Sequence, residues 1–490
     1  MLDFRPDTVS EDYRVLSQCS GFIPKDGSYQ TAYSAGASGY NTALAGDCIG
    51  ARAVKNDSGT TRLFMGSAAA IQEADGAGGW TDRSRGGGYT SGTNRWWFSQ
   101  GIAANEVIAT NYADEMQVST GAAFSNLTNA PKAKIVVTQS EALLAMNYND
   151  GSAVPNGIKI SDRGASTTWT AAVSNDAAAV RLVESPGAIV AGAVLNDLVI
   201  AWKRRSMYVG RFVAGDEKWQ FNLLSPYVGC LGQEAWAATP AGIIFIGEAG
   251  AYIFDGSVPR PIDRGIRRAL LTWNTASNSY GARVSISHDE YNSTVYIWIP
   301  DPAGGVNFYC YAYNYLEDRW SQPYPMAGDS DLGAGTTYTD FQAIVRDYNA
   351  YDHLSLAGTD PSNVGHFIVT GQDKIVTLNV TADASRTLAN TLMTTGRFRN
   401  NPDPDGYTLL KGVTAVWQSY PSGAATVSAD AYEYAALDAT AMVSKSATMD
   451  AKKRFDLMIS GHNISLDLTT TNTHCSIKDF LLKTQPAGKA

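Results

Sequence analysis

Short runs of alternating apolar and polar residues, separated by turns rich in Gly, Asn and Asp, occupy the chain from residue 61 to residue 324. Alternation over about four to eight residues predicts strands, and tight turns between them predict antiparallel pairing. The runs group into units of three or four strands with an aromatic residue near the end of each unit. These units span residues 61–82, 95–127, 133–171, 187–224, 234–262 and 285–324. A helix is expected near 266–274, "IRRALLTWN".

Repeated antiparallel units of about 40 to 50 residues with recurrent aromatics are typical of β-propeller blades. One blade cannot bury both of its faces alone, so blades stack around an axis and aromatic side chains fill the space between neighbours. Six units favour a six-bladed propeller. The segments 354–360 and 365–380 could complete the ring or form a seventh blade. The residues expected between strands or blades are Trp80, Trp169, Trp219 and Trp320.

The strand rhythm changes on both sides of this region. Residues 1–58 are irregular and predict an N-terminal arm or platform segment, and residues 59–380 form the expected propeller. Residues 381–490 contain widely spaced alternating strands, which predict a β-sandwich-like platform domain. The fold class expected is therefore all-β.

Composition supports this class and restricts the function. The chain has 490 residues, of which 44% are hydrophobic, and its 25 Tyr, 11 Trp and 46 Gly favour strands and turns. A net charge of −9 argues against a protein whose main task is to grip phosphates. The five cysteines form no CxxC pair, so we expect neither a disulfide framework nor a metal site, and no cofactor motif is present.

No membrane segment or signal peptide is expected. The longest apolar stretch, 187–202, is split by Asn196 and Asp197 into two strand-length runs. The first 16 residues, "MLDFRPDTVSEDYRVL", lack the basic and apolar regions of a secretory signal.

Two acidic, Gly-containing turns raise the alternative of a carbohydrate-processing propeller. These are "WTDRSRGGGY" at 80–89 and "ISDRGASTTW" at 160–169. The second resembles the Asp-box turn of sialidases, with Asp162, Gly164 and Trp169 in order. That turn is a folding element remote from catalysis, and no local cluster supplies the carboxylate pair that most glycosidases need. We therefore predict that the chain has no catalytic residues and is not an enzyme, with a glycan-binding or glycan-cleaving propeller as the alternative.

Three further motifs have a structural and a functional interpretation. "NPDPDGY" at 401–407 begins with the spacing of a calcium loop, but Gly412 stands where the final Glu would be, which favours a simple turn. His288, flanked by acids, is expected to be a surface or turn residue. The adjacent cations Lys203, Arg204 and Arg205 favour a solvated hairpin tip, and contact with DNA phosphates or an acidic neighbouring subunit is the alternative.

An ordered series of motifs carries a family resemblance over roughly residues 5–325. The series includes "GTTRLFMGSAAAIQE", "GWTDRSRGGGYT", "RWWFSQGIAANEVIATN", "ISDRGASTTW", "SMYVGRFVAGDEKWQFNLL" and "AGAYIFDGSVPRPI". In this order it resembles the tail nozzle, tail tubular and packaged-DNA-stabilisation proteins of short-tailed bacteriophages.

The resemblance implies a structural virion protein, made and assembled in the cytoplasm of the bacterial host. Such proteins form a homo-oligomeric ring, usually a hexamer, below the portal and its adaptor. The ring closes the DNA channel, passes the genome during ejection and anchors fibres or spikes. Its contact with double-stranded phage DNA would be transient and non-specific, which suits an acidic chain because like charges let a duplex slide.

Overall fold

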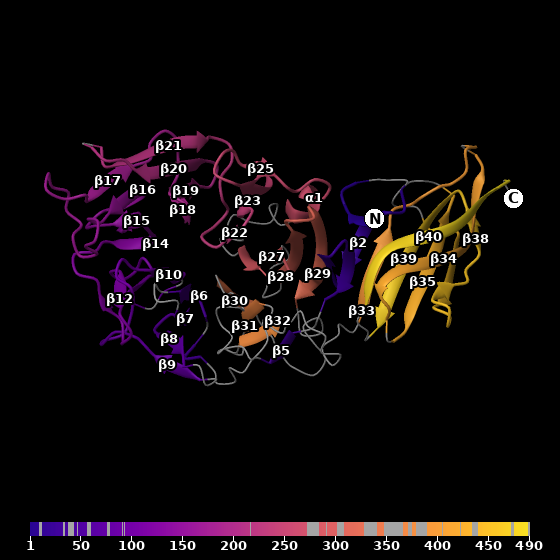
Figure 1. Cartoon of the computed structure of the whole chain (residues 1–490), viewed down its shortest axis with the longest axis horizontal. Helices are drawn as coiled ribbons and strands as arrows, with labels where there is room; N and C mark the ends of the chain where they lie inside the picture. Colours follow the sequence, from indigo (N-terminus) through magenta and orange to yellow (C-terminus); the bar gives the residue numbers. More distant parts are fainter. Residues whose placement is uncertain are drawn as a thin grey trace.

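The chain forms a β-propeller followed by a β-sandwich (Figure 1). The computed structural model describes residues 1–8, 12–32, 35–37, 44–46, 48–55, 60–75, 79–90, 92, 94–215, 217–271, 284–290, 292–300, 308–327, 341–346, 366–370, 375–378, 390–403, 405–421, 423–433, 440–471 and 475–488. The expectation of an all-β propeller with a sandwich-like domain is confirmed.

The propeller has seven blades, each a four-stranded antiparallel sheet. Four blades are separate sheets, two are joined in an eight-stranded sheet, and one is the start of a ten-stranded sheet, so 4 + 2 + 1 gives seven. The innermost strands are β6 (Gly50–Lys55), β10 (Trp97–Gln100), β14 (Lys132–Gln139), β18 (Ile189–Leu195), β22 (Trp236–Thr239), β26 (Ser285–Asp289) and β30 (Phe341–Arg346). The sequence favoured six blades because β30 lies outside every unit recognised in the pattern.

The outer strands follow in chain order in the first six blades. They are β7 (Thr61–Gly66), β8 (Ile71–Ala74) and β9 (Trp80–Asp82); β11 (Val107–Thr110), β12 (Gln117–Ser119) and β13 (Ser125–Asn126); β15 (Ala142–Asn149), β16 (Ala153–Ile160) and β17 (Ala178–Arg181); β19 (Leu198–Lys203), β20 (Met207–Phe212) and β21 (Trp219–Ser225); β23 (Gly242–Gly247), β24 (Gly250–Phe254) and β25 (Arg260–Pro261); β27 (Thr294–Pro300), β28 (Phe308–Asn314) and β29 (Arg319–Ala327). The helix expected near 266–274 is α1 (Arg267–Leu271), between the fifth and sixth blades.

The seventh blade closes the ring with strands from both ends of the propeller sequence. It consists of β30, β31 (His366–Thr370), β32 (Ile375–Leu378) and β5 (Ala35–Ala37). β5 pairs antiparallel with β32, and β30 pairs parallel with β6 of the first blade through Val345 and Ala51. The segment 365–380 therefore contributes strands to the seventh blade, whereas 354–360 lies outside the described residues.

These pairings place parts of the expected N-terminal arm inside the propeller. The boundary expected at residues 58 and 59 falls between β6 and β7, which pair from Gly50↔Gly66 to Lys55↔Thr61. The arm alone did not show the propeller pattern because β5 and β6 pair with strands that lie later in the chain.

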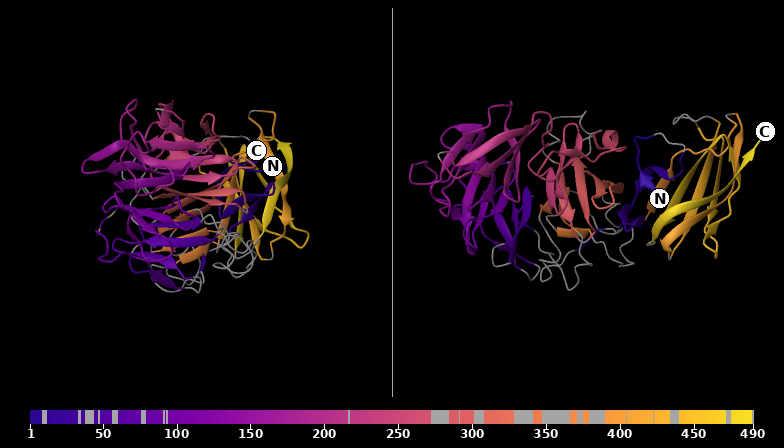
Figure 2. Two further views of the ribbon diagram at one scale, coloured as in Figure 1. Left: turned by 60° about the vertical axis from the view of Figure 1, so that its left-hand side comes forward. Right: turned by 45° about the horizontal axis from the view of Figure 1, so that its top comes forward.

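The sandwich combines both ends of the chain. One of its sheets continues the sixth blade through β2 (Val15–Ser20), with β1 (Asp3–Phe4) beside it, then β33 (Asn390–Thr395), β39 (Asn463–Thr471), β35 (Ala425–Tyr432) and β36 (Val443–Thr448). The other contains β3 (Phe22–Lys25), β4 (Ser28–Thr31), β40 (Ser476–Ala487), β34 (Tyr407–Ser419), β37 (Arg454–Phe455) and β38 (Ile459–Gly461). Figure 2 shows the indigo N-terminal strands between the propeller and the sandwich.

A buried arginine ties the propeller to the sandwich. Arg319, at the start of β29, is 5% exposed and donates from Nη2 to the Leu2 carbonyl (2.7 Å) and from Nη1 to the Ser28 carbonyl (3.3 Å). Its guanidinium lies 4.2 Å from the ring centroid of Tyr29, whose hydroxyl donates to the Trp320 carbonyl. A guanidinium satisfies several carbonyls at once, so these contacts fix the N-terminal segment against the sixth blade.

Aromatic packing fills the space between blades. Trp96 donates to the Ser67 carbonyl (2.8 Å), and a Cβ added to Gly66 would lie 2.1 Å from the Trp96 ring. Gly66 is therefore the residue that lets the indole lie flat on the first blade. Between the fourth and fifth blades, Trp202 lies 6.1 Å from Trp236 and 5.3 Å from Phe245, measured between ring centroids.

The aromatics named from the sequence differ in burial. Trp169, Trp219 and Trp320 are 3%, 5% and 3% exposed, whereas Trp80 is half-buried. Trp80 lies in β9, the outermost strand of the first blade, and no other strand among the described residues pairs with the outer edge of β9. It does not serve as a fully buried wedge.

Replacing Trp169, Trp219 or Trp320 by Ala is expected to lower the free energy of unfolding by about 3–5 kcal/mol, because each change leaves a cavity between strands. Trp80→Ala should lower the free energy of unfolding by a smaller amount, because Trp80 is only half-buried. Chemical denaturation of the four variants measures the difference, and equal losses at all four positions would contradict this assignment of burial.

Glu73 provides a pH-sensitive ion pair in the first blade. Glu73 is 8% exposed, and its carboxylate oxygens lie 2.6 Å from Arg62 Nε and 2.6 Å from Arg83 Nε. Burial acts to raise the pKa of Glu73, but hydrogen bonds and charge from the two arginines outweigh it, so the pKa is lowered.

A carboxylate with a lowered folded-state pKa contributes stability above its unfolded pKa of about 4.3, and this contribution is lost as the pH falls through the folded pKa. Glu73→Gln should therefore lower stability near neutral pH and flatten its decline on acidification. Melting temperatures between pH 7 and pH 3 test this, with Glu141→Gln as the exposed control. Parallel pH profiles for wild type and Glu73→Gln would refute the assignment.

Candidate functional site

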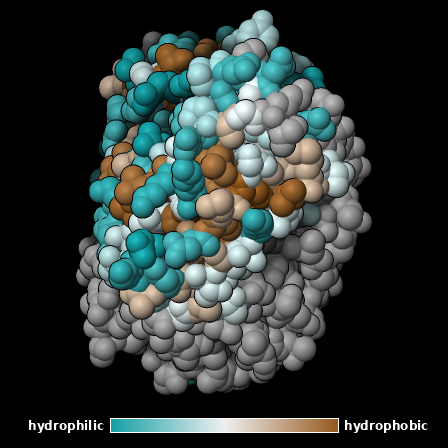
Figure 3. Space-filling model, turned by 90° about the vertical axis from the view of Figure 1, so that its right-hand side faces the viewer, coloured by the Kyte–Doolittle hydropathy of each residue, from teal (hydrophilic) through white to brown (hydrophobic). Residues whose placement is uncertain are grey.

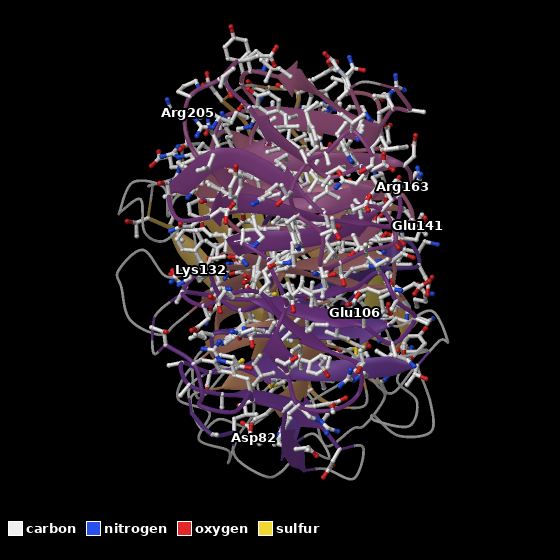
Figure 4. The ribbon with its side chains drawn as sticks, turned by 90° about the vertical axis from the view of Figure 1, so that its left-hand side faces the viewer. Asp82, Glu106, Lys132, Glu141, Arg163 and Arg205 are labelled. Carbon is white, nitrogen blue, oxygen red and sulfur yellow. The ribbon has the colours of Figure 1, made fainter. Side chains whose placement is uncertain are left out.

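The two faces of the propeller differ in the connections they carry. We call the face where the innermost strands begin the start face, and the opposite one the end face. Figure 4 shows Lys132 and Arg205 on one side and Glu106, Glu141 and Arg163 on the other. Lys132 opens the innermost strand β14 and therefore marks the start face.

A cavity of about 370 Å³ lies on the start face at the convergence of the second to fifth blades. Some lining residues lie just before or near the start of the innermost strand of a blade. The others lie at or near the end of the strand next to it. These residues are Asn94, Arg95, Asn111, Tyr112, Lys134, Asn147, Ala188, Ile189, Val190, Arg204, Leu231, Gly232 and Gln233. We call this space the start-face cavity.

Its charged lining residues are all cations, because the described lining contains Arg95, Lys134 and Arg204 and no carboxylate. Arg95 forms an ion pair with Glu234, which is 2% exposed, and Arg204 Nε lies 2.5 Å from Glu248 Oε1.

The carboxylate beside Arg204 stays ionised. Burial acts to raise the pKa of Glu248, but hydrogen bonds from Arg204 and Arg205 outweigh it and lower the pKa below its ordinary value. Glu248 therefore holds both guanidiniums in place as a charged partner.

Hydrogen bonds to the backbone fix the polar walls. Asn147 Nδ2 donates to the Ile189 carbonyl (2.9 Å), which links the third blade to the fourth. Gln233 Nε2 donates to the Lys134 carbonyl (3.1 Å), which links the segment before β22 to β14. These bonds hold the polar groups in place before any ligand arrives, which lowers the entropy cost of binding.

A second cavity of about 350 Å³ lies along the axis toward the end face. It is lined by innermost strands of five blades and contains the cations Arg52 and Lys55 and the indoles of Trp97 and Trp236. Arg52 lies 4.9 Å from the Trp97 ring centroid and donates to the Phe98 carbonyl (2.6 Å). Both cavities have the size of small-molecule pockets rather than of a passage for a double helix.

The three adjacent cations singled out from the sequence are separated by the fold. Lys203 is 1% exposed, and its ammonium donates to the carbonyls of Leu182 (2.7 Å) and Ser185. Burial lowers its pKa. The interpretation of one solvated tip is wrong for Lys203, because this residue ends the buried strand β19. Arg204 lines the start-face cavity, and only Arg205, at 81% exposure, is largely in solvent.

The turn at 80–89 is a structural element. Arg85 donates to Asp114 Oδ1 (2.8 Å), to the Asn126 side chain (2.6 Å) and to the Gly88 carbonyl (2.7 Å). Gly87 and Gly88 have positive φ angles of 88° and 70°, which the tight turn requires. The arginine is therefore engaged in fixing this loop to the second blade.

The turn at 160–169 is held by its own acid. Asp162 Oδ1 accepts hydrogen bonds from the backbone N–H groups of Arg163 (2.9 Å) and Asp176 (2.8 Å). Trp169 donates to the Ser166 carbonyl (2.7 Å) and is buried. This arrangement agrees with the folding role expected of an Asp-box-like turn.

The remaining motifs also have structural partners. In 401–407, Asn401 Oδ1 accepts from the Asp403 N–H and Asp403 Oδ1 accepts from the Asp405 N–H, so these oxygens cap a turn. Within the described part of the chain, no three His, Cys, Asp or Glu residues are placed to hold a metal ion. His288 is a half-buried residue of strand β26, and its Nε2 lies 3.1 Å from the Tyr315 hydroxyl, so it is not a turn residue.

Sequence patterns do not indicate the start-face cavity. Arg95, Lys134 and Asn147 stand in three separate segments, and no catalytic or ligand-binding motif marks them. Of the cavity residues, only Arg204 was a candidate beforehand. The set could be found only by aligning the blades around the axis.

No protein-family model matches the sequence, and no curated protein matches it. Solved structures match at low identity. PorZ, a surface component of the type-IX secretion system of Porphyromonas gingivalis, is 12% identical, with 84% of this chain and 58% of PorZ covered and a TM-score of 0.38. The chain thus spans little more than half of PorZ.

Two shorter proteins match over most of their own length. The WD40 domain of Toxoplasma gondii coronin is 10% identical, with 75% of this chain and 90% of that domain covered and a TM-score of 0.40. A streptogramin B lyase is 10% identical, with 69% and 96% covered and a TM-score of 0.40. These likenesses concern the fold alone.

None of the described helices has the length and apolar character needed to cross a membrane.

Lys203 and Arg205 should respond differently to substitution. Lys203→Met removes the donor that satisfies two buried carbonyls and is expected to cost about 1–3 kcal/mol of folding free energy. Arg205→Met removes an exposed partner of Glu248 and should change stability by less than about 1 kcal/mol. Denaturant unfolding of both variants measures the contrast, and a Lys203→Met protein as stable as wild type would contradict the structural role.

Proposed function

We propose that the chain is a structural subunit of the tail of a short-tailed bacteriophage, of the nozzle or tail-tube type. The ordered motif series supports the family. The structural observation that carries the proposal is the continuity of the sixth blade with the sandwich through β29 and β2, pinned by Arg319. A subunit that retains pressurised DNA needs domains that do not hinge, and a shared sheet with buried hydrogen bonds meets that need.

The genome channel would lie between subunits and not within one of them. Each axial cavity of the propeller measures only about 350 to 370 Å³ and is lined by cations, so neither suits the passage of a duplex. A ring of copies, which we propose to be a hexamer, would surround the DNA with surfaces of several chains. The overall charge of −9 favours weak contact with the genome.

The sandwich offers apolar surface for ring contacts. Figure 3 shows apolar side chains gathered on the part of the molecule farthest from the propeller. The exposed large apolar residues of this domain are Tyr420, Met442, Val443, Met458 and Leu481, with exposures of 44% to 58%. Exposed apolar patches mark interaction surfaces, and neighbouring copies in the ring are the occupants we propose. The portal adaptor and the fibres or spikes would bind the assembled ring in the virion.

The proposal predicts a defect in genome retention. Particles assembled without the chain should package DNA and then lose it, because the channel below the adaptor stays open. Alternatively, they should fail to attach fibres, because the ring that anchors the fibres is missing. Nuclease-accessible DNA in purified particles measures the loss. The isolated chain should bind duplex DNA only weakly at physiological salt.

Leu481→Asp and Met458→Asp together should prevent ring formation on the adaptor, whereas Val173→Asp, at a fully exposed loop position of the propeller, should not. Mass measurement of the assembled complexes distinguishes the two. Infectious DNA-filled particles without the chain, or tight sequence-specific DNA binding by it, would overturn the proposal.

A further inference from the structure

We propose that the start-face cavity binds an acidic sugar, that is, a pyranose carrying a carboxylate, such as a hexuronate. This inference rests on the cavity itself and holds whether or not the chain forms a ring. It assigns a ligand class to residues that no binding motif in the sequence marks.

The charge of the cavity selects an anion. Arg95, Lys134 and Arg204 line it, and the carboxylates of Glu234 and Glu248, which pair with Arg95 and Arg204, lie outside the lining. Lys134 is exposed, and its ammonium has no ion pair with any residue that the structure describes. Its recorded side-chain contact is with the Tyr112 ring, at 5.4 Å from the centroid. One positive charge is thus left facing the cavity, where a ligand carboxylate can form a charge-assisted hydrogen bond.

The neutral polar groups select hydroxyls. Asn94, Asn147 and Gln233 bring primary amides to the walls, and each amide offers both donors and an acceptor. Asn147 and Gln233 use their N–H groups on backbone carbonyls, which leaves their oxygens as acceptors at fixed positions. Sugar hydroxyls donate and accept, so they can satisfy these groups together.

The apolar part of the wall suits the C–H face of a pyranose. Tyr112, Val190 and Leu231 lie among the polar groups. A phenol beside aliphatic carbons gives an amphipathic surface, which sugars also present. Tyr112 has a positive φ of 64° in the turn after β11, an uncommon conformation for a residue other than glycine.

Size and chemistry indicate binding and not cleavage. A volume of about 370 Å³ is at the small end of ligand pockets, which suits one or two sugar rings and excludes a duplex. Glycoside hydrolysis usually needs two carboxyl groups facing the substrate, and the described lining contains none.

An acidic protein side chain fits less well than an acidic sugar. Its carboxylate could pair with Lys134, but its aliphatic stem offers no donor to the amide oxygens of Asn147 and Gln233. Leaving buried polar groups unpaired is costly. The hydroxyls of a sugar avoid that cost.

The test is calorimetric titration of the full chain with methyl glucuronide, methyl glucoside and acetate. We expect binding of the glucuronide, with affinity at least about tenfold weaker for the other two, because each lacks either the charge or the hydroxyls. Lys134→Gln should weaken glucuronide binding about tenfold and leave glucoside binding unchanged. Lys483→Gln, an exposed lysine of the sandwich, is the matched control and should bind as wild type.

A steric variant keeps the test independent of charge. Ala188→Trp would place an indole in the cavity without altering its cations, and it should abolish binding while the melting temperature stays near that of wild type. Equal affinity for glucuronide and acetate, or undiminished glucuronide binding by Lys134→Gln and Ala188→Trp, would overturn the proposal. No binding of the glucuronide by wild type would also overturn it. None of these titration results bears on ring assembly or genome retention, so the two proposals are tested separately.

Discussion

The requirement that every blade be covered on both faces governs this molecule. The inner strands are buried on both sides, as in β23, the second strand of the fifth blade, where all six residues are buried, so each sheet needs a neighbour on either side. Seven blades satisfy this only if the last meets the first. The parallel contact of β30 with β6 and the pairing of β5 with β32 provide that closure. A chain that left the ring open would expose two large apolar sheet faces to water.

The same closure explains how the two domains are joined. The segment that supplies β5 to the last blade has already supplied β2, β3 and β4 to the sandwich, so the N-terminal region belongs to both bodies. Arg319 and Tyr29 then fasten this region to the sixth blade through buried hydrogen bonds. Because a buried guanidinium without partners is expensive, the junction has one favoured geometry. The domains are therefore coupled, which is the property that the proposed tail role depends on.

Convergence of the blades also creates the start-face cavity and the second axial cavity, both of ligand size. Innermost strands from several blades bring side chains from distant segments to the axis, and cations from those segments meet there. The cations near the axis contrast with a chain that is acidic as a whole. Net charge governs long-range repulsion, whereas the ligand preference of the cavity depends on a few groups within hydrogen-bond distance of a ligand. The two proposed contacts therefore do not contradict each other, because weak contact with DNA depends on the net charge and binding of a small anion depends on the cavity.

Local features of the fold could be predicted from the sequence, because strand alternation, turn chemistry and the short helix depend on neighbours in the chain. Six blades, the helix at Arg267–Leu271 and the turn around Asp162 belong to this class. The seventh blade, the burial of Lys203 and the start-face cavity do not. They arise from pairings such as Ala51 with Val345 and Tyr29 with Ile477, whose partners lie hundreds of residues apart. Such contacts leave no periodic trace in either segment, so only the closed tertiary structure decides which side chains share a surface.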